Sequence, residues 1–226
     1  MPVIEARGVG HAYGDRTVLR DLDVTLGEQR VGVVGANGSG KSTFARMLNG
    51  LVLPTQGRVT VDGLDTRTRR RTSRPRVGFC FTDPDAQIVM PTVAEDVAFG
   101  LRRRGLTKAE VAERVTTALA TYGLAGHADH PAHLLSGGQK QLLALASVLV
   151  TEPDVLVMDE PTTLLDLRNA TMISRVVAGL PQQVLLVTHH LELLEGFDRV
   201  LVFDEGRVVC DDEPDAAVGY YRKLMG

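Results

Sequence analysis

A glycine-rich octapeptide in the first fifth of the chain has the residue types that bind phosphate. It reads Gly-Ala-Asn-Gly-Ser-Gly-Lys-Ser and spans Gly35–Ser42. Glycines let backbone N–H groups turn toward phosphate oxygens, and a helix beginning directly after the loop adds the positive end of its dipole. In this spacing the lysine can reach the β- and γ-phosphates, and the serine hydroxyl can ligate Mg²⁺. The residues expected to contact a nucleotide here are Gly35, Asn37, Gly38, Ser39, Gly40, Lys41, Ser42 and Thr43.

An acidic pair, Asp159-Glu160, ends the apolar segment Val155–Met158. A strand ending in two carboxylates places the first where it can hold Mg²⁺ and the second where it faces a water that attacks the γ-phosphate. Adjacent carboxylates near a phosphate would repel it without a metal, which itself favours Mg²⁺. An ordinary acidic turn would look the same in isolation, so the prediction depends on the loop at Gly35–Ser42.

A second glycine motif, Leu-Ser-Gly-Gly-Gln-Lys at Leu135–Lys140, lies between the loop and the acidic pair. It supplies phosphate donors that have no place in the first site. The simplest explanation is that two chains face each other and each completes the other's site. A small-molecule kinase with a phosphate loop would leave this motif unexplained.

Composition narrows the class of protein. With 226 residues, 44% of them hydrophobic, the chain can bury roughly 70–75% of its unfolded surface. The net charge is −3, so no global basic field indicates nucleic acid. The two cysteines, Cys80 and Cys210, have no metal-ligand spacing and suggest a reducing compartment. The longest apolar run, Leu142–Val150, is far short of a span of ~20 residues, so we expect no membrane crossing.

Alternating strand and helix signals predict an α/β fold with layers around the phosphate loop. The capping-box patterns Thr107–Glu110 and Ser136–Gln139 mark two helix starts. The expected strands are Val3–Arg7, Val18–Leu26, Val31–Val34, Val59–Asp62, Val77–Phe81, Val155–Met158, Val184–Thr188 and Val200–Phe203. The expected helices are Lys41–Asn49, Thr92–Arg103, Thr107–Tyr122, Gln141–Val150, Leu167–Ala178, Leu191–Glu195 and one at the C-terminus.

The motif at Leu135–Lys140, together with the loop and the acidic pair, resembles the signature of ATP-binding-cassette (ABC) ATPases over essentially the whole chain. The resemblance implies an ABC-type P-loop NTPase with an antiparallel β-subdomain, a mixed-sheet nucleotide-binding core and a helical signature subdomain. The core is expected at residues 1–91 and 151–226, and the helical subdomain at 92–150. ATP and Mg²⁺ are the implied cofactors.

The resemblance also assigns roles to single residues. Tyr13 matches the aromatic residue that stacks on adenine, and Gln87 matches the glutamine that touches Mg²⁺ and the lytic water. Glu160 is the expected catalytic base, and His189 matches the switch histidine that contacts the γ-phosphate. The expected metal ligands are Ser42, Gln87 and Asp159. The residues expected to meet the opposite subunit's nucleotide or cross the dimer interface are Ser136, Gly137, Gly138, Gln139 and Asp166.

Two positions depart from the family pattern. His190 stands where the family usually has aspartate, and we interpret it as structural. Leu164 stands where the family often has a small residue, which affects how the dimer interface packs. Tyr13 and His189 can also be interpreted without a function. Tyr13 would then be a half-exposed packing aromatic, and His189 an ordinary histidine at the end of a strand.

Finer resemblance lies around Gln87. Asp83-Pro-Asp-Ala-Gln87 and Glu95-Asp-Val-Ala-Phe-Gly-Leu are similar to the ATPases of energy-coupling-factor (ECF) importers for vitamins and metal ions. Within that group Pro161–Asn169 is most similar to the biotin importers, and the cobalt and nickel importers are close competitors. The resemblance implies a second ATPase subunit, most simply a homodimer. It also implies a transmembrane scaffold with a substrate-binding membrane subunit, no nucleic acid, and a peripheral location on the cytoplasmic face of the membrane.

Three alternatives remain open from the sequence. A soluble ATPase clamp acting on nucleic acid or ribosomes is disfavoured, because only one cassette is present and no coiled-coil insertion precedes the signature. The arginine-rich segments Arg67–Arg76 and Arg102–Arg104 fit either a solvated surface or contact with anionic lipid. Glu95 and Asp96 fit either favourable charge at a helix N-terminus or the carboxylate that receives an arginine of the scaffold.

Overall fold

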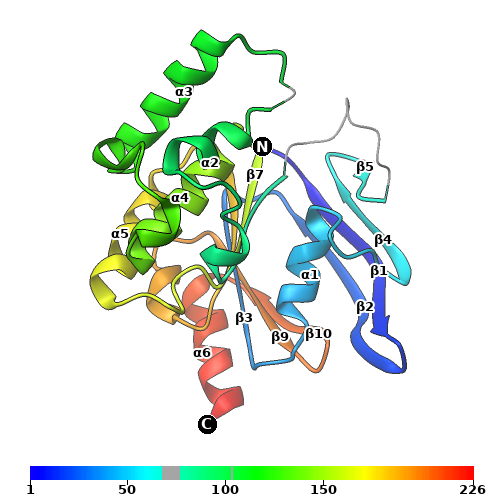
Figure 1. Ribbon diagram of the computed structural model, residues 1–226. Helices are drawn as coiled ribbons and strands as arrows, with labels where there is room; N and C mark the ends of the chain where they lie inside the picture. The colour runs from blue at the N-terminus through cyan, green and yellow to red at the C-terminus, as the bar shows by residue number, and fades with distance from the viewer. Residues whose placement is uncertain (68–76, 103) are drawn as a thin grey trace. The chain divides into compact units, whose positions relative to one another are not determined.

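The structure is a computed structural model that describes residues 1–67, 77–102 and 104–226 (Figure 1). Apart from Arg67, the arginine-rich segment that ends at Arg76 lies outside these residues, as does Arg103. The chain divides into two compact units. Unit 1 comprises Met1–Phe79, Asp154–Glu160 and Leu180–Gly226, and unit 2 comprises Cys80–Pro153 and Pro161–Gly179.

Unit 1 contains a four-stranded antiparallel sheet in the order β2-β1-β4-β5. Its long strands alternate buried and exposed side chains, as expected for a sheet with one solvated face. The strands are β1 (Ile4–Tyr13), β2 (Arg16–Leu26), β4 (Gln56–Val61) and β5 (Leu64–Asp65).

The second sheet has six strands in the order β10-β9-β3-β8-β7-β6. The pairs β9-β3, β3-β8 and β8-β7 are parallel, and β10 pairs antiparallel with β9. Every residue of β3, β7 and β8 is buried, which explains their continuous apolar runs. The strands are β3 (Arg30–Gly35), β6 (Val77–Cys80), β7 (Val155–Asp159), β8 (Gln183–Val187), β9 (Arg199–Asp204) and β10 (Arg207–Asp212).

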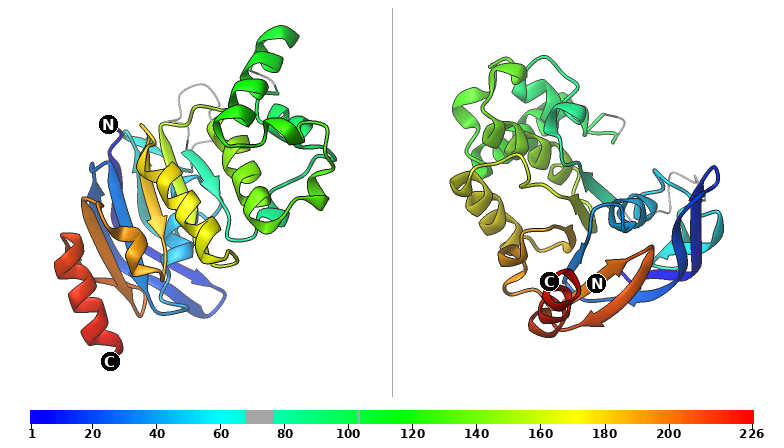
Figure 2. Two further views of the ribbon diagram at one scale, coloured as in Figure 1. Left: turned by 90° about the vertical axis from the view of Figure 1, so that its left-hand side faces the viewer. Right: turned by 90° about the horizontal axis from the view of Figure 1, so that it is seen from below.

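Two helices pack in unit 1. Helix α1 (Lys41–Leu48) contacts β2 and β4 of the first sheet and β3, β7 and β8 of the second, so it lies between the two sheets (Figure 2). Helix α6 (Pro214–Met225) contacts β3, β9 and β10. Phe44 of α1 stacks against Phe203 at the end of β9 with ring centroids 5.5 Å apart. This contact fixes α1 over the carboxyl ends of the parallel strands.

Unit 2 is helical and is organised around α4 (Gly137–Leu149), which contacts α2 (Val93–Phe99), α3 (Lys108–Thr121) and α5 (Leu167–Ala178). Side chains of Thr92, Thr107 and Ser136 cap α2, α3 and α4 in reciprocal capping boxes. Unit 2 extends beyond the expected range 92–150, because the turn Pro84–Ala86 and helix α5 both contact α4.

Most expected elements are confirmed, α5 with the same bounds, and the fold class is confirmed. Several details differ; β1 runs on to Tyr13, past the expected end at Arg7, and α2 ends at Phe99 rather than at Arg103. Leu191–Leu194 forms a 3₁₀ turn rather than an α-helix, because it is only four residues long. Strands β5 and β10 were not expected, since β5 has two residues and β10 is a largely exposed edge strand. Within the described ranges, no helix is long and apolar enough to cross a membrane.

Candidate active site

Strand β3 leads directly into the phosphate loop, whose glycines adopt conformations that other residues rarely take. Gly35, Gly38 and Gly40 have φ values of 149°, 80° and 104°. A Cβ on Gly35 would lie 2.2 Å from the carbonyl oxygen of Phe203, and one on Gly40 would lie 2.6 Å from the Leu19 side chain. Glycine is therefore required for the loop to turn here.

Lys41 is buried at the start of α1, with 5% of its surface exposed. Its Nζ donates hydrogen bonds to the carbonyl oxygens of Gly35 at 2.7 Å and Ala36 at 2.8 Å. Burial lowers the pKa of Lys41, and the charges of Glu160 and Asp159 oppose that shift. The loop thus curls around a desolvated ammonium group, which suits it to an anionic ligand.

The side-chain oxygens of Ser42 and Asp159, two potential metal ligands, lie within hydrogen-bond distance of each other. The Ser42 hydroxyl donates to Asp159 Oδ1 at 2.7 Å, and Arg46 approaches Asp159 Oδ2 at 3.3 Å. Neighbouring ligands of an octahedral Mg²⁺ at ~2.1 Å lie about 3 Å apart, so these oxygens fit the ion. Burial is the main cause of the raised pKa of Asp159, while Ser42 and Arg46 act in the opposite direction.

A buried polar atom in the loop also fits a nucleotide. Ser39 is 4% exposed, and its hydroxyl has no hydrogen-bond partner among the described residues. Within the same residues no group of three or more His, Cys, Asp and Glu side chains could hold a metal ion. Magnesium needs no such group, because it usually takes one or two protein ligands and completes its shell with phosphates and water.

Glu160 and His189 form a close pair across the ends of β7 and β8. His189 Nδ1 lies 2.5 Å from Glu160 Oε2, and the Glu160 backbone N–H donates to Val187 O at 2.9 Å. Glu160 has a φ of 53°, an uncommon conformation for a residue other than glycine. Unit 1 therefore brings together the phosphate loop, Asp159, Glu160 and His189, all expected in one site.

Tyr13 lies at the end of β1 with 51% of its surface exposed, which leaves its ring open to a ligand. The His11 ring meets it edge-on, with ring centroids 4.5 Å apart at 85°. His11 is 7% exposed, and neither of its ring nitrogens has a hydrogen-bond partner among the described residues. His11 was not among the residues expected from the sequence, and simple alternation could not have indicated it, because the pairing of β1 with β2 is irregular on both sides of His11.

Unit 2 carries the second glycine motif at the N-terminus of α4. Ser136 and Gln139 bond each other's backbone N–H groups, and Gln139 Nε2 lies 3.1 Å from His127 Nε2. The two glycines differ. A Cβ on Gly138 would lie 2.3 Å from the Asn169 side chain of α5, whereas one on Gly137 would meet nothing within 4 Å. Packing explains Gly138, whereas no contact among the described residues requires glycine at position 137.

Asp166 and Gln87 are both held within unit 2. Asp166 caps α5 by accepting a hydrogen bond from the Asn169 backbone N–H at 2.8 Å. The Gln87 side chain accepts from Phe81 N at 3.1 Å and donates to Ala144 O at 3.0 Å. It also bonds Cys80, whose thiol pKa burial raises to about 12. Gln87 thus has its amide fully engaged in its own unit.

Three links join the segment Asp85–Asp96 to one face of α4. Lys140 forms an ion pair with Asp85 at 2.7 Å, Ala144 O accepts from Gln87, and Ser147 Oγ donates to Asp96 Oδ2 at 2.8 Å. Positions 140, 144 and 147 share one helical face. We call these contacts the α4 links; they bind the segment around Gln87 to the helix of the second glycine motif.

Glu95 and Asp96 have different surroundings. Glu95 is exposed and closes the capping box with Thr92. Asp96 is 3% exposed, and its carboxylate accepts from the backbone of Val89 at 2.9 Å, from that of Met90 at 3.1 Å, and from Ser147. Asp96 is therefore committed to internal hydrogen bonds, and Glu95 is the one of the two that a partner can reach.

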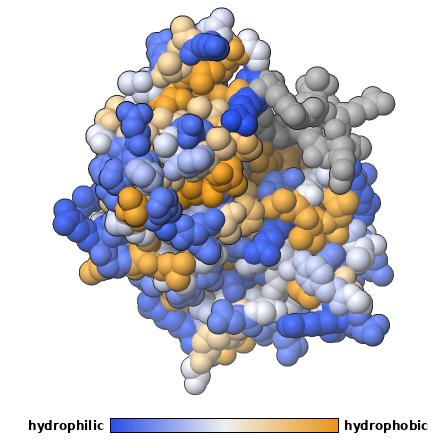
Figure 3. Space-filling view, in the orientation of Figure 1, coloured by the Kyte–Doolittle hydropathy of each residue, from blue (hydrophilic) through white to orange (hydrophobic). Residues whose placement is uncertain are grey.

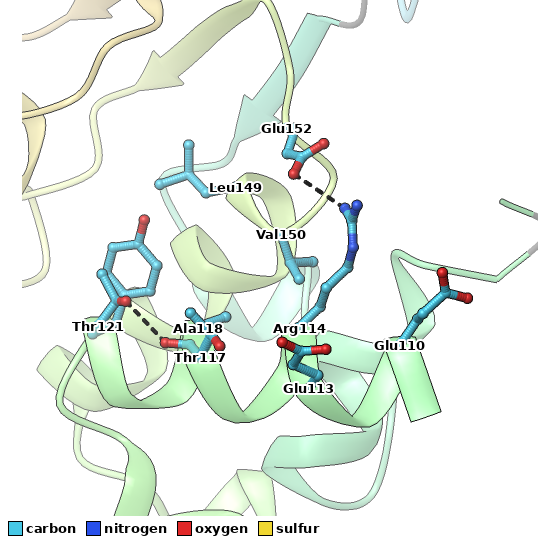
Figure 4. Close-up of a pocket in the computed structure, with 10 residues that line it drawn as sticks. Glu110, Glu113, Arg114, Thr117, Ala118, Thr121, Leu149, Val150 and Glu152 are labelled. Atoms are coloured by element: carbon cyan, nitrogen blue, oxygen red, sulfur yellow. Dashed lines mark hydrogen bonds and ion pairs between the residues drawn. The ribbon is translucent and has the colours of Figure 1, made fainter. Parts of the chain in front are cut away.

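Two cavities lie elsewhere in unit 2, and Glu95 is the one candidate coupling residue that lines either of them. One of about 480 Å³ lies beside α3 and the end of α4, with the ion pair Arg114–Glu152 at 3.1 Å on its rim (Figure 4). The other, of about 520 Å³, runs between α2 and α3 and is lined mainly by apolar residues, some of which are visible as an orange area over α3 (Figure 3). Neither holds a cluster of reactive side chains.

Comparison with known proteins gives a consistent result. The sequence profile described as ABC transporter matches residues 19–163. A biotin transport ATP-binding protein BioM of Rhizobium etli is 48% identical over 98% of both chains. An energy-coupling factor transporter ATP-binding protein EcfA1 of Symbiobacterium thermophilum is 46% identical over 92% of this chain and 78% of its own. The solved structure of CbiO1 from Clostridium perfringens, part of the ABC transporter complex CbiONQ, superposes with a TM-score of 0.84. It is 32% identical over 98% of this chain and 93% of its own.

The different surroundings of Asp96 and Glu95 predict that substitutions at the two positions affect the stability of the fold differently. Asp96→Ala should lower the free energy of unfolding by about 2–4 kcal/mol, because it strands two backbone donors and the Ser147 hydroxyl. Glu95→Gln should change it by less than ~0.5 kcal/mol, since glutamine also closes a capping box. Urea unfolding of the two variants measures both effects. Equal stability of the two would show that the Asp96 hydrogen bonds contribute little.

Proposed function

The chain belongs to the ABC transporter family, as an ATPase, and from this premise we propose that it is the ATP-hydrolysing subunit of an ECF importer whose cargo is biotin. The observation that carries the catalytic part is the convergence of the phosphate loop, Asp159, Glu160 and His189 in unit 1. Sequence similarity to BioM and EcfA1 supports the importer and its cargo. A cobalt or nickel importer is the alternative; a relative that is 40% identical to this chain is named a cobalt import ATP-binding protein CbiO.

The proposed site divides its work among named groups. Backbone N–H groups of the loop and the Lys41 ammonium bind the β- and γ-phosphates of ATP, and Tyr13 stacks on the base. Ser42, Asp159 and Gln87 would hold Mg²⁺, which would neutralise charge on the phosphates when bound. For Gln87 this requires that its amide leave Phe81 and Ala144.

Glu160 is the proposed general base, because it directly follows the metal-holding Asp159. Its carboxylate accepts the proton of the attacking water, and His189 orients that carboxylate through the 2.5 Å contact. The strained φ of Glu160 supports this assignment, since such strain gathers at functional sites.

Ser136, Gly137, Gly138, Gln139 and Asp166 are proposed to act on a second copy of the chain. The open space at Gly137 supports this, because a glycine without an internal reason leaves room for an external group. The N-terminus of α4 then offers its N–H groups and dipole to the partner's γ-phosphate. The scaffold and a substrate-binding membrane subunit complete the assembly, at the cytoplasmic face of the membrane.

The base assignment has a direct kinetic test. Glu160→Gln should lower kcat for ATP hydrolysis by ~10²–10⁴ while ATP binding persists, because only the proton acceptor is removed. Phosphate release and equilibrium binding of a fluorescent ATP analogue measure the two effects. Asp154→Asn, another acidic residue of unit 1, serves as the control. Turnover within threefold of wild type in Glu160→Gln would exclude Glu160 as base.

Action across a dimer has a separate test. Gly137→Asp should leave folding and ATP binding intact, since the position is open and an acidic residue suits the first turn of a helix. It should abolish hydrolysis by repelling the partner's phosphate. Mixing it with Lys41→Ala, itself inactive, should restore activity, because one composite site of the mixed dimer then has both groups intact. Failure to complement, with mixed dimers confirmed by tandem purification, would contradict this arrangement.

The cargo is tested by transport. Membrane vesicles containing this chain with the scaffold and substrate-binding proteins encoded beside it should take up radiolabelled biotin, and vesicles with Glu160→Gln should not. Uptake of cobalt or nickel ions without biotin would establish the alternative. Recovery of the chain with ribosomes or nucleic acid instead of membranes would overturn the importer proposal.

A further inference from the structure

A histidine outside the second glycine motif contacts that motif directly. His127 ends the 3₁₀ turn Ala125–His127, and its Nε2 lies 3.1 Å from Nε2 of Gln139 in the first turn of α4. We propose that His127 is a positioning residue for Gln139: its ring holds the amide in the orientation in which the motif meets the nucleotide of a second copy. This inference rests on the proposed function, because it assigns a support to residues proposed to act across a dimer.

The hydrogen-bond roles in this contact follow from the neighbouring Ser136. A backbone N–H can only donate, so the atom of the Gln139 amide that lies 2.9 Å from Ser136 N is the carbonyl oxygen Oε1. The amide nitrogen therefore faces His127 and donates to it. His127 accepts through the lone pair of Nε2, and the second N–H of the Gln139 amide has no partner among the described residues.

Packing alone does not account for a histidine at this position. The His127 ring meets that of His130 edge-on, with centroids 5.7 Å apart at 82°, a contact that any flat ring could make. Its Nδ1 is buried, and it has no hydrogen-bond partner among the described residues. Such an atom costs free energy that an apolar ring would not incur. The bond from Gln139 is the one side-chain hydrogen bond of His127 in the described part of the chain.

The backbone holds His127 from two sides. Its N–H donates to the carbonyl oxygen of Leu124 at 2.9 Å, and Leu124 is fully buried. The residue after it, Ala128, accepts at 2.9 Å from the N–H of Ala94 in the first turn of α2. The imidazole therefore stands on a support that is joined to the start of α2. A displacement of that helix start would move the ring and, through it, the Gln139 amide.

This arrangement prepares the N-terminus of α4 for an external ligand. While His127 holds the amide, Gln139 Oε1 satisfies the Ser136 N–H, and the second amide N–H and the Ser136 hydroxyl hydrogen remain as side-chain donors. Both suit oxygen atoms of the partner's nucleotide. Without an acceptor at position 127 the amide can rotate, and ordering it again when the dimer closes costs conformational entropy. His127 thus supports the closed dimer without touching the nucleotide.

The first test separates ring shape from hydrogen bonding. His127→Phe keeps a flat ring but offers no acceptor, so kcat for ATP hydrolysis should fall by about five- to twentyfold, the effect of losing one hydrogen bond. His127→Ala should show the same loss. His127→Gln places an amide oxygen near the position of Nε2 and should restore kcat to within about twofold of wild type. His133→Gln, at an exposed histidine of the same segment, is the matched control and should leave kcat unchanged.

A double-mutant cycle distinguishes positioning of Gln139 from a general effect on the fold. Gln139→Ala removes the amide, so adding His127→Phe to it should cost no further activity. Equilibrium ATP binding should be equal in all these variants, because the groups proposed to bind ATP within one chain lie in unit 1. Losses in kcat that simply multiplied in the double variant would show that His127 acts independently of Gln139, and would overturn the inference.

A further readout does not depend on turnover. Hydrogen exchange of the full chain without nucleotide, followed by NMR, reports on the Ser136 N–H. In His127→Phe this N–H should exchange about tenfold faster than in wild type, because the Gln139 oxygen is no longer held against it, and His127→Gln should restore its protection. Equal exchange in wild type and His127→Phe would contradict the proposal. If the wild-type chain hydrolysed no ATP, the proposed function would fail, while the exchange of Ser136 would still decide whether His127 holds Gln139.

Discussion

The desolvated ammonium of Lys41 is the constraint on which the site depends. A buried cation is costly unless it is paired and hydrogen-bonded, and Lys41 is satisfied by two loop carbonyls and by the charges of Asp159 and Glu160. The carbonyls follow from the end of β3, and Asp159 and Glu160 lie at the end of β7. The sheet order, with β3 central and β7 one strand away across β8, is what brings them to one edge. The glycine conformations of the loop follow, because its carbonyls must turn toward the ammonium.

Local signals in the sequence predicted much of this arrangement. The loop, the capping boxes at Thr107 and Ser136 and the buried strands depend on neighbours in the chain, so pattern alone locates them. Contacts between distant segments were not predictable. The Asp96–Ser147 hydrogen bond joins residues 51 positions apart. The edge contact of His11 with Tyr13 is local, but it depends on side-chain rotamers, which the sequence pattern does not report. The strand β10 was missed because an exposed edge strand lacks apolar periodicity.

The two glycines of the second motif have different structural roles. In the sequence Gly137 and Gly138 form one motif, but their surroundings in the structure differ. Gly138 admits the Asn169 side chain of α5, and any larger residue would separate two helices of unit 2. Gly137 faces open space, so packing among the described residues does not require glycine there. The proposed contact with a second copy of the chain would give Gly137 the role that its own surroundings do not.

The α4 links have a mechanical consequence for coupling. Three non-covalent contacts join the segment Asp85–Asp96 to α4 over two helical turns. They are an ion pair, a hydrogen bond from the Gln87 side chain and a hydrogen bond between a hydroxyl and a carboxylate. Two of these links are partly buried, and such hydrogen bonds cost free energy when broken without replacement, so the segment and the helix move most easily as one body. The middle link alone involves a residue proposed to leave, because Gln87 must release Ala144 to reach the metal. The outer links at Lys140 and Ser147 then keep the register while Gln87 moves. In the proposed importer, a force that the scaffold applied to this segment would therefore reach Ser136 and Gly137 through α4 without passing through the nucleotide.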